Sequence, residues 1–374
     1  MSGEKKVLFV AFSERYSGAE MSLVELAEGI GRRSSWEVHL AHGKNASRLN
    51  AAFSAHPTFP LPALPLHKSR NPFHWLRLLI NWIQVVFQLR KLMRSQDIDL
   101  IHANSWKDGL YAGPAARLAG LPCFCHLRDH QPHRLVNWLL RKTCRHFICV
   151  SHFIRQHAPL PPARSAVIYN GMSSPATASP PLHFPHIPPS ATVIAQVGQI
   201  VPWKGFADGI EVAAMLCAGN PELHFLLVGG DWEGMQSELV RSLKERVQAL
   251  GLEERIHFCG QVEDMEGLWR QVDVLVHCAR KEPFGRVVAE AMLRRVPVVA
   301  VASGGPAEVL EEGANGLLYK EGDQEGMANG VALLLSDAAL RESLVENAAA
   351  WAAKELNPDA QIAKLEALFN KTSN

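Results

Sequence analysis

Two carboxylates, Glu282 and Glu290, stand in the run Arg-Lys-Glu-Pro-Phe-Gly-Arg-Val-Val-Ala-Glu at residues 280–290. Proline and glycine at its centre predict a turn with Glu282 at its tip, followed by a helix that places Glu290 about two turns further on. Carboxylates accept hydrogen bonds from ribose hydroxyls, and the N–H of Gly285 near the helix start suits a phosphate or sugar oxygen. The run is a candidate ligand site, although two solvated helix glutamates are the ordinary alternative.

Two further loops carry groups of the same kind. Gly198 and Lys204 lie in Val-Gly-Gln-Ile-Val-Pro-Trp-Lys-Gly at 197–205, where the glycine lets the backbone approach a ligand and the lysine offers a point charge to a diphosphate. Glu308 ends the segment Ser-Gly-Gly-Pro-Ala-Glu at 303–308, which opens a predicted helix with proline at its first position. Taken singly, these residues are an ordinary surface lysine and a good helix start, so the prediction of a ligand site rests on their combination.

The first half of the chain contributes two polar segments at the ends of predicted strands. Gly18 lies in Ser-Gly-Ala-Glu at 17–20, which lets a loop close on a diphosphate from the opposite side of a cleft. His126 lies in Cys-His-Leu-Arg-Asp at 125–129, at the expected cleft-facing edge of a sheet. A polar trio that ends an apolar strand is more telling than a lone histidine, because most histidines are surface or core groups. Neither a dinucleotide-binding GxGxxG nor a Walker A pattern occurs.

We expect no metal site. Asp97 and Asp99 imitate an Asp-x-Asp metal signature, but they directly precede a predicted strand at 100–103 and are expected to begin it. The seven cysteines form an odd set within apolar runs, which is typical of buried free thiols. Cys123 and Cys125 lack a second Cys or His pair at a zinc-binding spacing.

Short apolar runs alternate with amphipathic segments along the whole chain, a pattern that predicts βαβ units around parallel sheets. In the first half, the predicted strands are 7–12, 36–41, 100–103, 122–127, 147–150 and 167–169, with helices at 18–31 and 107–119. In the second half, the predicted strands are 193–197, 225–228, 256–258, 274–276 and 296–301. The fold class is therefore α/β, with two Rossmann-like, doubly wound domains that face a common cleft. Ligands of such sheets bind where the carboxyl ends of strands open onto helix N-termini.

A proline-rich stretch interrupts the alternation and predicts a linker. We expect a first domain over 1–172, a linker over 173–190, a second domain over 191–355 and a terminal segment over 356–374 that crosses back to the first domain. A chain of 374 residues is long enough for two ordinary hydrophobic cores.

Charge is distributed unevenly between the two halves. Residues 1–185 carry 22 Lys and Arg against 10 Asp and Glu, a net charge of +12, whereas residues 186–374 carry 16 against 27, a net charge of −11. The basic half favours anionic partners such as phosphates or an anionic membrane. No nucleic-acid-binding motif accompanies the charge, so we expect no nucleic-acid partner. Residues 1–6 lead straight into a strand-like run without a hydrophobic leader, which predicts a cytoplasmic location.

The segment 71–94 is rich in large apolar residues, but polar residues interrupt it too often for a membrane-spanning helix of about 20 mostly apolar residues. Its aromatic residues and terminal cations suit a helix over 74–94 that lies peripherally on the cytoplasmic face of an anionic membrane. These residues are Trp75, Trp82, Phe87, Arg90, Lys91 and Arg94. A core helix whose polar side faces water explains the same pattern, and both interpretations stay open.

Together these segments resemble family 4 of the retaining GT-B glycosyltransferases, and the resemblance covers nearly the whole chain. It rests on the Glu282–Glu290 pair around Glu-Pro-Phe-Gly, on the Val-Gly run that ends at Lys204-Gly205, on Gly304-Gly305 with Glu308, on Asn315-Gly316-Leu317-Leu318, on Ser17-Gly18-Ala19-Glu20 and on Val167-Ile168-Tyr169-Asn170-Gly171. The order and spacing of these motifs are highly specific in the second domain and looser in the first.

The resemblance implies a role for each site residue. Glu290 would bind the donor ribose and Lys204 the diphosphate, while Glu282, with the backbone of Phe284 and Gly285, would hold the transferred sugar and its β-phosphate. Gly18, Gly198 and Glu308 would complete the donor site, and His126 would be the family's cleft histidine beside the sugar. Gln199 departs from the family, which commonly has arginine there, and the candidates to replace that cation are Arg128, Arg280 and Arg286.

By the same resemblance, the first domain binds an acceptor and the second a nucleotide-sugar donor. The expected activity is a retaining, metal-independent hexosyl or related transfer from a UDP-sugar or GDP-sugar, without a cofactor, to a glycan or lipid-linked saccharide in cell-surface polysaccharide or lipopolysaccharide assembly. The alternatives are a GT-B sugar-nucleotide epimerase, which would release UDP and free sugar, and a non-catalytic subunit that binds sugar nucleotides. Intact Glu282 and His126 argue against the non-catalytic subunit.

Overall fold

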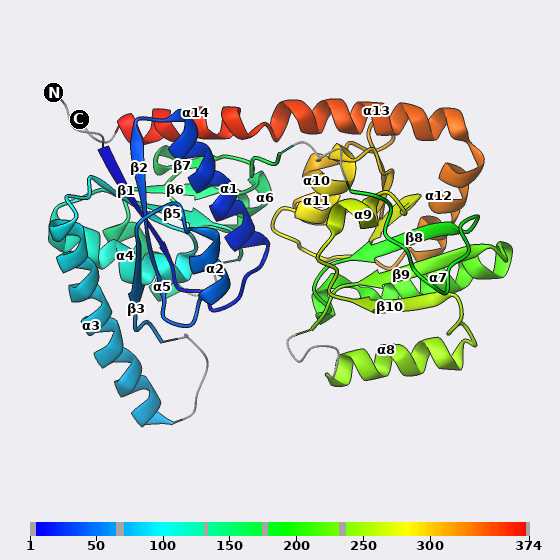
Figure 1. Ribbon diagram of the computed structural model, residues 1–374, viewed down its shortest axis with the longest axis horizontal. Coiled ribbons are helices and arrows are strands. Elements are labelled where there is room, and N and C mark those ends of the chain that lie inside the picture. Colours follow the sequence, from blue (N-terminus) through cyan, green and yellow to red (C-terminus); the bar gives the residue numbers. More distant parts are fainter. Residues whose placement is uncertain (1–4, 65–70, 131–133, 174–178, 232–236, 372–374) are drawn as a thin grey trace. The chain divides into compact units, whose positions relative to one another are not determined.

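The computed structural model describes residues 5–64, 71–130, 134–173, 179–231 and 237–371. The chain divides into two compact units, of which the first comprises residues 1–172 and 356–374 and the second residues 173–355. Each unit is an α/β unit built on a single parallel sheet (Figure 1). The predicted α/β fold class with two doubly wound units is confirmed.

The first unit has a seven-stranded sheet in the order β3-β2-β1-β4-β5-β6-β7, with parallel pairing throughout. Its strands are β1 (Lys5–Ala11), β2 (Trp36–Gly43), β3 (Thr58–Leu61), β4 (Leu100–Ala103), β5 (Cys123–Leu127), β6 (His146–Cys149) and β7 (Ser165–Val167). Its helices are α1 (Gly18–Arg33), α2 (Ser47–Ala52), α3 (Pro72–Ser95), α4 (Trp106–Ala119), α5 (Arg134–Thr143), α6 (His152–His157) and α14 (Pro358–Asn370).

The second unit has a six-stranded parallel sheet in the order β10-β9-β8-β11-β12-β13. Its strands are β8 (Thr192–Val197), β9 (Leu223–Val228), β10 (Ile256–Gly260), β11 (Val274–His277), β12 (Val298–Val301) and β13 (Leu317–Tyr319). Its helices are α7 (Phe206–Gly219), α8 (Glu238–Ala249), α9 (Met265–Trp269), α10 (Arg286–Leu293), α11 (Pro306–Val309), α12 (Gln324–Ser336) and α13 (Ala338–Glu355).

The predicted strands differ from the structure mainly at the edges of the sheets. The strand predicted at 167–169 ends at Val167 and begins two residues earlier, and the short edge strands β3 and β13 were not predicted. Edge strands of three or four residues carry too few alternations for a pattern to be visible. The described part of the proline-rich stretch forms no helix or strand and belongs to the second unit, where the N–H of Leu182 donates to the Gly267 carbonyl at 2.8 Å.

The terminal helix α14 completes the core of the first unit. Asn357 caps it by accepting hydrogen bonds from the N–H groups of Asp359 and Ala360, at 2.8 and 3.2 Å, and proline follows at the first helical position. Ile362, Leu365 and Phe369 are buried in the same apolar cluster as β1, β2 and α1. The first unit therefore has part of its apolar core supplied by residues that lie more than 300 positions after β1 and β2 in the sequence (Figure 1).

Candidate functional site

Three predicted motif loops meet at the carboxyl edge of the second sheet. They follow β8, β11 and β12, which are neighbours in the order β8-β11-β12. Backbone hydrogen bonds join them: the N–H of Arg280 donates to Trp203 O at 2.8 Å, and the N–H of Gly305 donates to Glu282 O at 2.7 Å. Segments that are 78 residues apart in the sequence thus form one polar site.

Glu282 is buried at the centre of this site and bonds to two positively ionisable side chains. Lys204 Nζ lies 2.6 Å from Glu282 Oε1, and His277 Nε2 lies 2.7 Å from Glu282 Oε2. The sequence predicted Glu282 at the tip of a turn, and it left open whether Lys204 is a ligand contact or an ordinary surface lysine. The structure instead buries both, with Lys204 in a 3-10 turn before α7.

His277 is the member of this trio that the sequence analysis missed. It is the last residue of β11, whose preceding residues are all apolar and buried. A polar residue at the carboxyl end of an apolar strand was the available signal, because that is where ligands of such sheets bind.

The trio keeps Glu282 ionised. Burial by itself raises the pKa of a carboxyl group, but the positive charges and hydrogen bonds of Lys204 and His277 outweigh that effect and hold the pKa of Glu282 at about 2. The site therefore contains a fixed carboxylate beside a lysine ammonium, and the ammonium has further N–H donors to offer a ligand.

Glycines let the backbone approach this trio closely. Gly304 has a φ of +71°, and a Cβ added there would lie 2.3 Å from Glu282 O. Gly285, with a φ of +87°, is the N-cap of α10, the helix that follows β11 at the same edge of the sheet. Gly198 lies beside the side chain of Lys204, and a Cβ there would be 3.6 Å from Nζ. Phe284, which directly precedes Gly285 in the chain, is buried.

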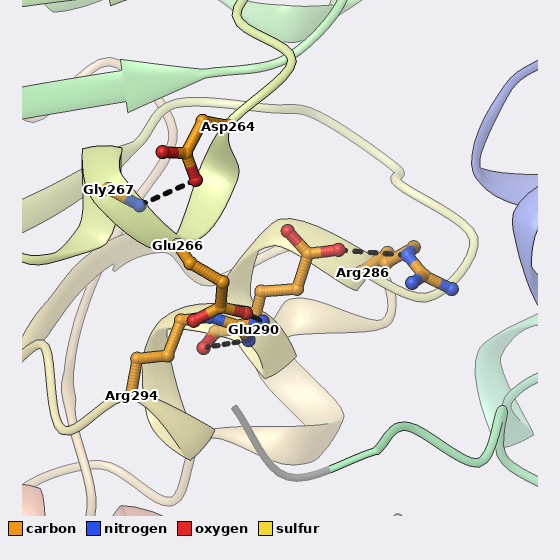
Figure 2. A network of polar contacts seen from close by, with 6 residues as sticks. All are labelled: Asp264, Glu266, Gly267, Arg286, Glu290 and Arg294. Carbon is orange, nitrogen blue, oxygen red and sulfur yellow. Dashed lines mark hydrogen bonds and ion pairs between the residues drawn. The ribbon is translucent and has the colours of Figure 1, made fainter. Parts of the chain in front are cut away.

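Glu290 is the fifth residue of α10, which is closer to the turn than the two helical turns that the sequence predicted. It is buried, and its Oε1 accepts a hydrogen bond of 2.9 Å from Arg286 Nε (Figure 2). Arg294 at the end of the helix donates to the Glu290 carbonyl and also pairs with Glu266 of α9 (Figure 2). The Arg294–Glu266 ion pair therefore fixes the C-terminal end of the helix that contains Glu290.

The candidate replacements for the family arginine at Gln199 are differently placed. Arg286 pairs with Glu290, and Arg280 forms ion pairs with Asp208 at 2.8 Å and Glu321 at 3.0 Å. Arg128 belongs to the first unit. Gln199 itself is half-buried directly after Gly198. Glu308, in the single-turn helix α11, is also half-buried, and Pro306 occupies the first position of that helix as predicted.

In the first unit, Gly18 is exposed as the first residue of α1, directly after the loop that follows β1. The N–H and hydroxyl of Ser17 both donate to Glu20 Oε2, at 3.0 and 2.6 Å. Glu20 thereby closes a capping box and fixes the start of the helix.

His126 lies inside the first unit and not on a surface facing a cleft. Its side chain is 0% exposed, and its Nδ1 lies 3.2 Å from Nε2 of His102 on the neighbouring strand β4. Two residues later, Arg128 lies just beyond the end of β5. Its Nε and Nη1 donate to the side-chain oxygens of Asn104 and Asn170 at 2.9 and 2.7 Å. The structure thus assigns the polar edge of this sheet to Arg128, and places His126 beneath it.

The buried histidine pair makes stability depend on pH. Burial, reinforced by the charge of Arg128, lowers the pKa of His102 to about 3 and that of His126 well below 6.5. Asp108 shows the opposite behaviour, because burial raises its pKa to about 7 even though it accepts hydrogen bonds from Ser105 and Phe12. The two histidines contribute fully to the free energy of unfolding above about pH 6.5, and this contribution is lost as the pH falls. The contribution of Asp108 is lost in the opposite direction, as the pH rises through about 7.

Asp108→Asn should therefore make acid destabilisation steeper. Asparagine can keep both hydrogen bonds but takes up no proton, so the variant loses a group that offsets the two histidines between about pH 4 and 6.5. The unfolding free energy should then fall by about 1.4 kcal/mol more per pH unit than in the parent. Urea titrations at a series of pH values measure this difference, in which all other groups cancel. Equal slopes for parent and variant would contradict the assignment.

Asp97 and Asp99 directly precede β4, as predicted, and Asp99 Oδ2 accepts a hydrogen bond of 2.7 Å from the N–H of Lys6. Within the described ranges, no three His, Cys, Asp or Glu side chains lie close enough together to ligate one metal ion.

Helix α3 combines both interpretations of the segment 71–94. One face packs against α4 through buried residues such as Leu78, Val85 and Leu89. The opposite face exposes large apolar side chains to between 42% and 77%: Phe73, Trp75, Leu76, Leu79, Ile80, Ile83 and Phe87. Trp82 departs from the expectation of a membrane anchor, because it turns inward and donates to Leu110 O at 2.8 Å. None of the described helices is long and apolar enough to cross a bilayer.

Known proteins resemble both units. Residues 183–351 match the family described as "Glycosyl transferases group 1", and residues 16–174 match "Glycosyltransferase Family 4". A lipopolysaccharide core biosynthesis glycosyltransferase, LpsE of Rhizobium meliloti (strain 1021), is 33% identical over 159 residues, or 42% of this chain and 44% of its own. The match spans less than half the length of that relative.

Solved structures match nearly the whole chain. The structure of Anabaena HepE in complex with UDP and glucose has a TM-score of 0.79 and 26% identity, and the match covers 98% of this chain and 99% of that one. Sucrose-phosphate synthase from Thermosynechococcus elongatus has a TM-score of 0.77 and 20% identity, with 98% of each chain covered, which is a likeness of fold alone.

Proposed function

Because the chain belongs to the family 4 glycosyltransferases, the group 1 glycosyl transferases of GT-B fold, we propose that it transfers a sugar from a nucleotide-diphosphate donor to an acceptor with retention of configuration. The acceptor is a glycan or a lipid-linked saccharide in cell-surface polysaccharide or lipopolysaccharide assembly. The relative LpsE, named for lipopolysaccharide core biosynthesis, supports this acceptor class. The donor is a UDP-sugar or GDP-sugar, and HepE, solved with UDP and glucose, supports the nucleotide sugar.

The buried Lys204–Glu282–His277 trio at the carboxyl edge of the second sheet carries this proposal. As the bond between the sugar C1 and the leaving oxygen breaks, negative charge grows on the β-phosphate and positive charge on the sugar ring. A preorganised ammonium on Lys204 and the N–H at Gly285 stabilise the phosphate, while the Glu282 carboxylate faces the sugar. These groups need no reorganisation during the reaction, because the ion pair and the helix start are already fixed.

The remaining residues complete the donor site in this proposal. Glu290 accepts hydrogen bonds from the ribose hydroxyls with the oxygen that Arg286 does not occupy. The backbone of Phe284 and Gly198 contacts the sugar and the diphosphate, and Glu308 follows the glycine pair Gly304–Gly305. Gly18 is a further proposed donor contact. In the first unit, Arg128 is the proposed polar contact at the edge of the sheet, and His126 holds the strand end in place from beneath.

An assay of donor consumption with and without acceptor tests the proposal. A panel of nucleotide sugars is first screened for thermal stabilisation, because a ligand of the native state raises apparent stability. The stabilising donor should then be consumed only with an acceptor saccharide, and the NMR coupling constant of the product should show the anomeric configuration of the donor. Release of UDP and free sugar without acceptor would identify an epimerase, and no consumption at all a non-catalytic subunit. An inverted product would overturn the retaining mechanism.

Transfer is expected to continue in a strong chelator. The proposed phosphate contacts are Lys204 and backbone N–H groups, so the leaving group gains its stabilisation without a divalent ion. Initial rates with and without EDTA measure this, with magnesium or manganese added back as the control. A rate that falls with EDTA and returns with metal would reopen the case for Asp97 and Asp99.

We further propose a cytoplasmic protein that attaches peripherally to an anionic membrane through residues 74–94. The exposed apolar face of α3, which contains no acidic residue over its whole length, supports this attachment.

A further inference from the structure

A basic pocket lies along α5 in the first unit, outside the site described above. It has a volume of about 420 Å³ and lies between α5 and the segment that leads into β7. Its lining includes Arg134, Asn137, Trp138, Arg141, Lys142 and Arg164. Four of these residues are cationic, and none of the described residues that line the pocket is acidic, so the pocket suits an anionic ligand.

Arg164 is held in place at one end of the pocket. Its two terminal nitrogens, Nη1 and Nη2, donate to the carbonyls of Cys144 and Arg141 at 3.3 and 3.0 Å. These carbonyls lie at the end of α5, where the backbone has acceptors without partners inside the helix. One cation of the pocket is therefore oriented before any ligand arrives, which suits the recognition of a phosphate group.

Asn137 is a second, independent feature of the pocket. Its side chain is only 7% exposed, and its Oδ1 is buried with no hydrogen-bond partner among the described residues. Such an acceptor is nearly always satisfied in a native protein, so its state here points to a bound group that carries hydroxyls. A phosphate ester with free hydroxyl groups would satisfy both Asn137 and the cations.

The surroundings of the pocket indicate where that ester comes from. Helix α4 packs against both α3 and α5, so the three helices form one layer on the sheet of the first unit (Figure 1). This layer contains nine Lys and Arg residues but a single acidic residue, the buried Asp108. On α5 itself, Leu135 and Trp138 are 70% and 60% exposed, so this helix, like α3, has large apolar side chains in contact with solvent.

We propose that the α5 pocket binds the phosphate of a hydroxylated anionic phospholipid headgroup, such as phosphoglycerol, at a bilayer surface. The exposed side chains of α3 and α5 enter the interface, and the cations of the pocket take the phosphate between them. This inference rests on the proposed peripheral attachment, to which it adds a headgroup site and a lipid class.

Flotation of the full chain with vesicles tests the site. The vesicles contain phosphatidylcholine alone or with phosphatidylglycerol, and the variant Arg134→Gln/Arg141→Gln removes two pocket cations. Binding to the phosphatidylglycerol vesicles should weaken roughly thirtyfold, as expected for two cations at an anionic surface. The control Arg32→Gln/Lys44→Gln removes two exposed cations from the same unit outside the three helices, and should bind like the parent. Equal weakening in both variants would show that binding depends only on net charge, and would overturn the proposal of a headgroup site in the pocket.

Two further arms identify the ligand. Asn137→Leu keeps every charge, and it should abolish a preference for phosphatidylglycerol over phosphatidylserine vesicles of equal charge; an unchanged preference would overturn headgroup recognition. If soluble glycerol phosphate raises the melting temperature of the parent while the double variant still floats like the parent, the pocket takes a soluble ester and the lipid assignment fails. Flotation does not depend on sugar transfer, so its results can be interpreted even if the proposed transferase activity is not found. Variants that lose membrane binding but still transfer sugar would show that the lipid site and the transfer site are distinct.

Discussion

Replacing Lys204 by methionine is expected to lower the rate of sugar transfer by roughly 10²–10³-fold, the effect of removing one preorganised group that stabilises a developing oxyanion. Methionine keeps most of the side-chain volume and loses only the charge and the N–H donors. The ammonium of Lys204 is the cation nearest to Glu282 and the proposed phosphate contact, so its effect should be larger in turnover than in donor binding. Steady-state kinetics with a saturating donor measures it.

The buried ion pair complicates this test, because the variant leaves Glu282 with His277 as its remaining partner. Breaking one side of a buried pair costs about 3–5 kcal/mol of stability. The double variant Lys204→Met/Glu282→Gln removes both charges and should regain most of that stability while remaining slow. Lys354→Met, at an exposed lysine on α13, is the matched control and should transfer like the parent. A well-folded double variant with parental activity would show that the trio is structural.

Glu290→Gln should weaken nucleotide binding by about 1.5–3 kcal/mol, which corresponds to roughly tenfold to 150-fold in affinity. Hydrogen bonds from ribose hydroxyls to a carboxylate are charge-assisted, and an amide of the same shape replaces one of the acceptor oxygens by a donor. Calorimetric titration with the nucleotide diphosphate measures the loss without requiring an acceptor.

A second variant separates binding by Glu290 from the position of its helix. Glu266→Gln removes the ion pair with Arg294 that anchors α10 at its base but leaves the carboxylate of Glu290 in place (Figure 2). It should bind nucleotide nearly as the parent does. If both variants lose affinity equally, the position of α10 controls binding; if neither does, Glu290 lies outside the donor site.

The fold and the site motifs were largely predictable because they depend on local patterns. Apolar runs that alternate with amphipathic segments predicted the central strands, since a strand buried on both faces requires a nearly continuous apolar sequence. The loops that begin at Gly198, Cys278 and Ala302 all follow such strands, so their place at the carboxyl edge of the sheet could be expected before the strand order was known.

The direction of individual side chains was less predictable. Strand periodicity could not show that the His126 ring would meet His102, because the neighbour of a strand is set by the sheet order. Trp82 lies on a helix that is apolar on both faces, so the sequence pattern did not distinguish its inward side chain from the outward side chains of Trp75 and Phe87.

The sequence by itself determined that this protein has two parallel α/β units and that its chemical groups lie in loops after apolar strands, because hydrophobic periodicity and turn residues act over a few positions. Only the tertiary structure decided that Glu282 is buried between Lys204 and His277, with its pKa held at about 2. The sequence also led us to expect that the terminal segment returns to the first domain, but only the tertiary structure decided that Ile362, Leu365 and Phe369 of α14 are buried in its core. Burial and charge pairing depend on which strands and loops become neighbours, and those neighbours come from segments far apart in the chain.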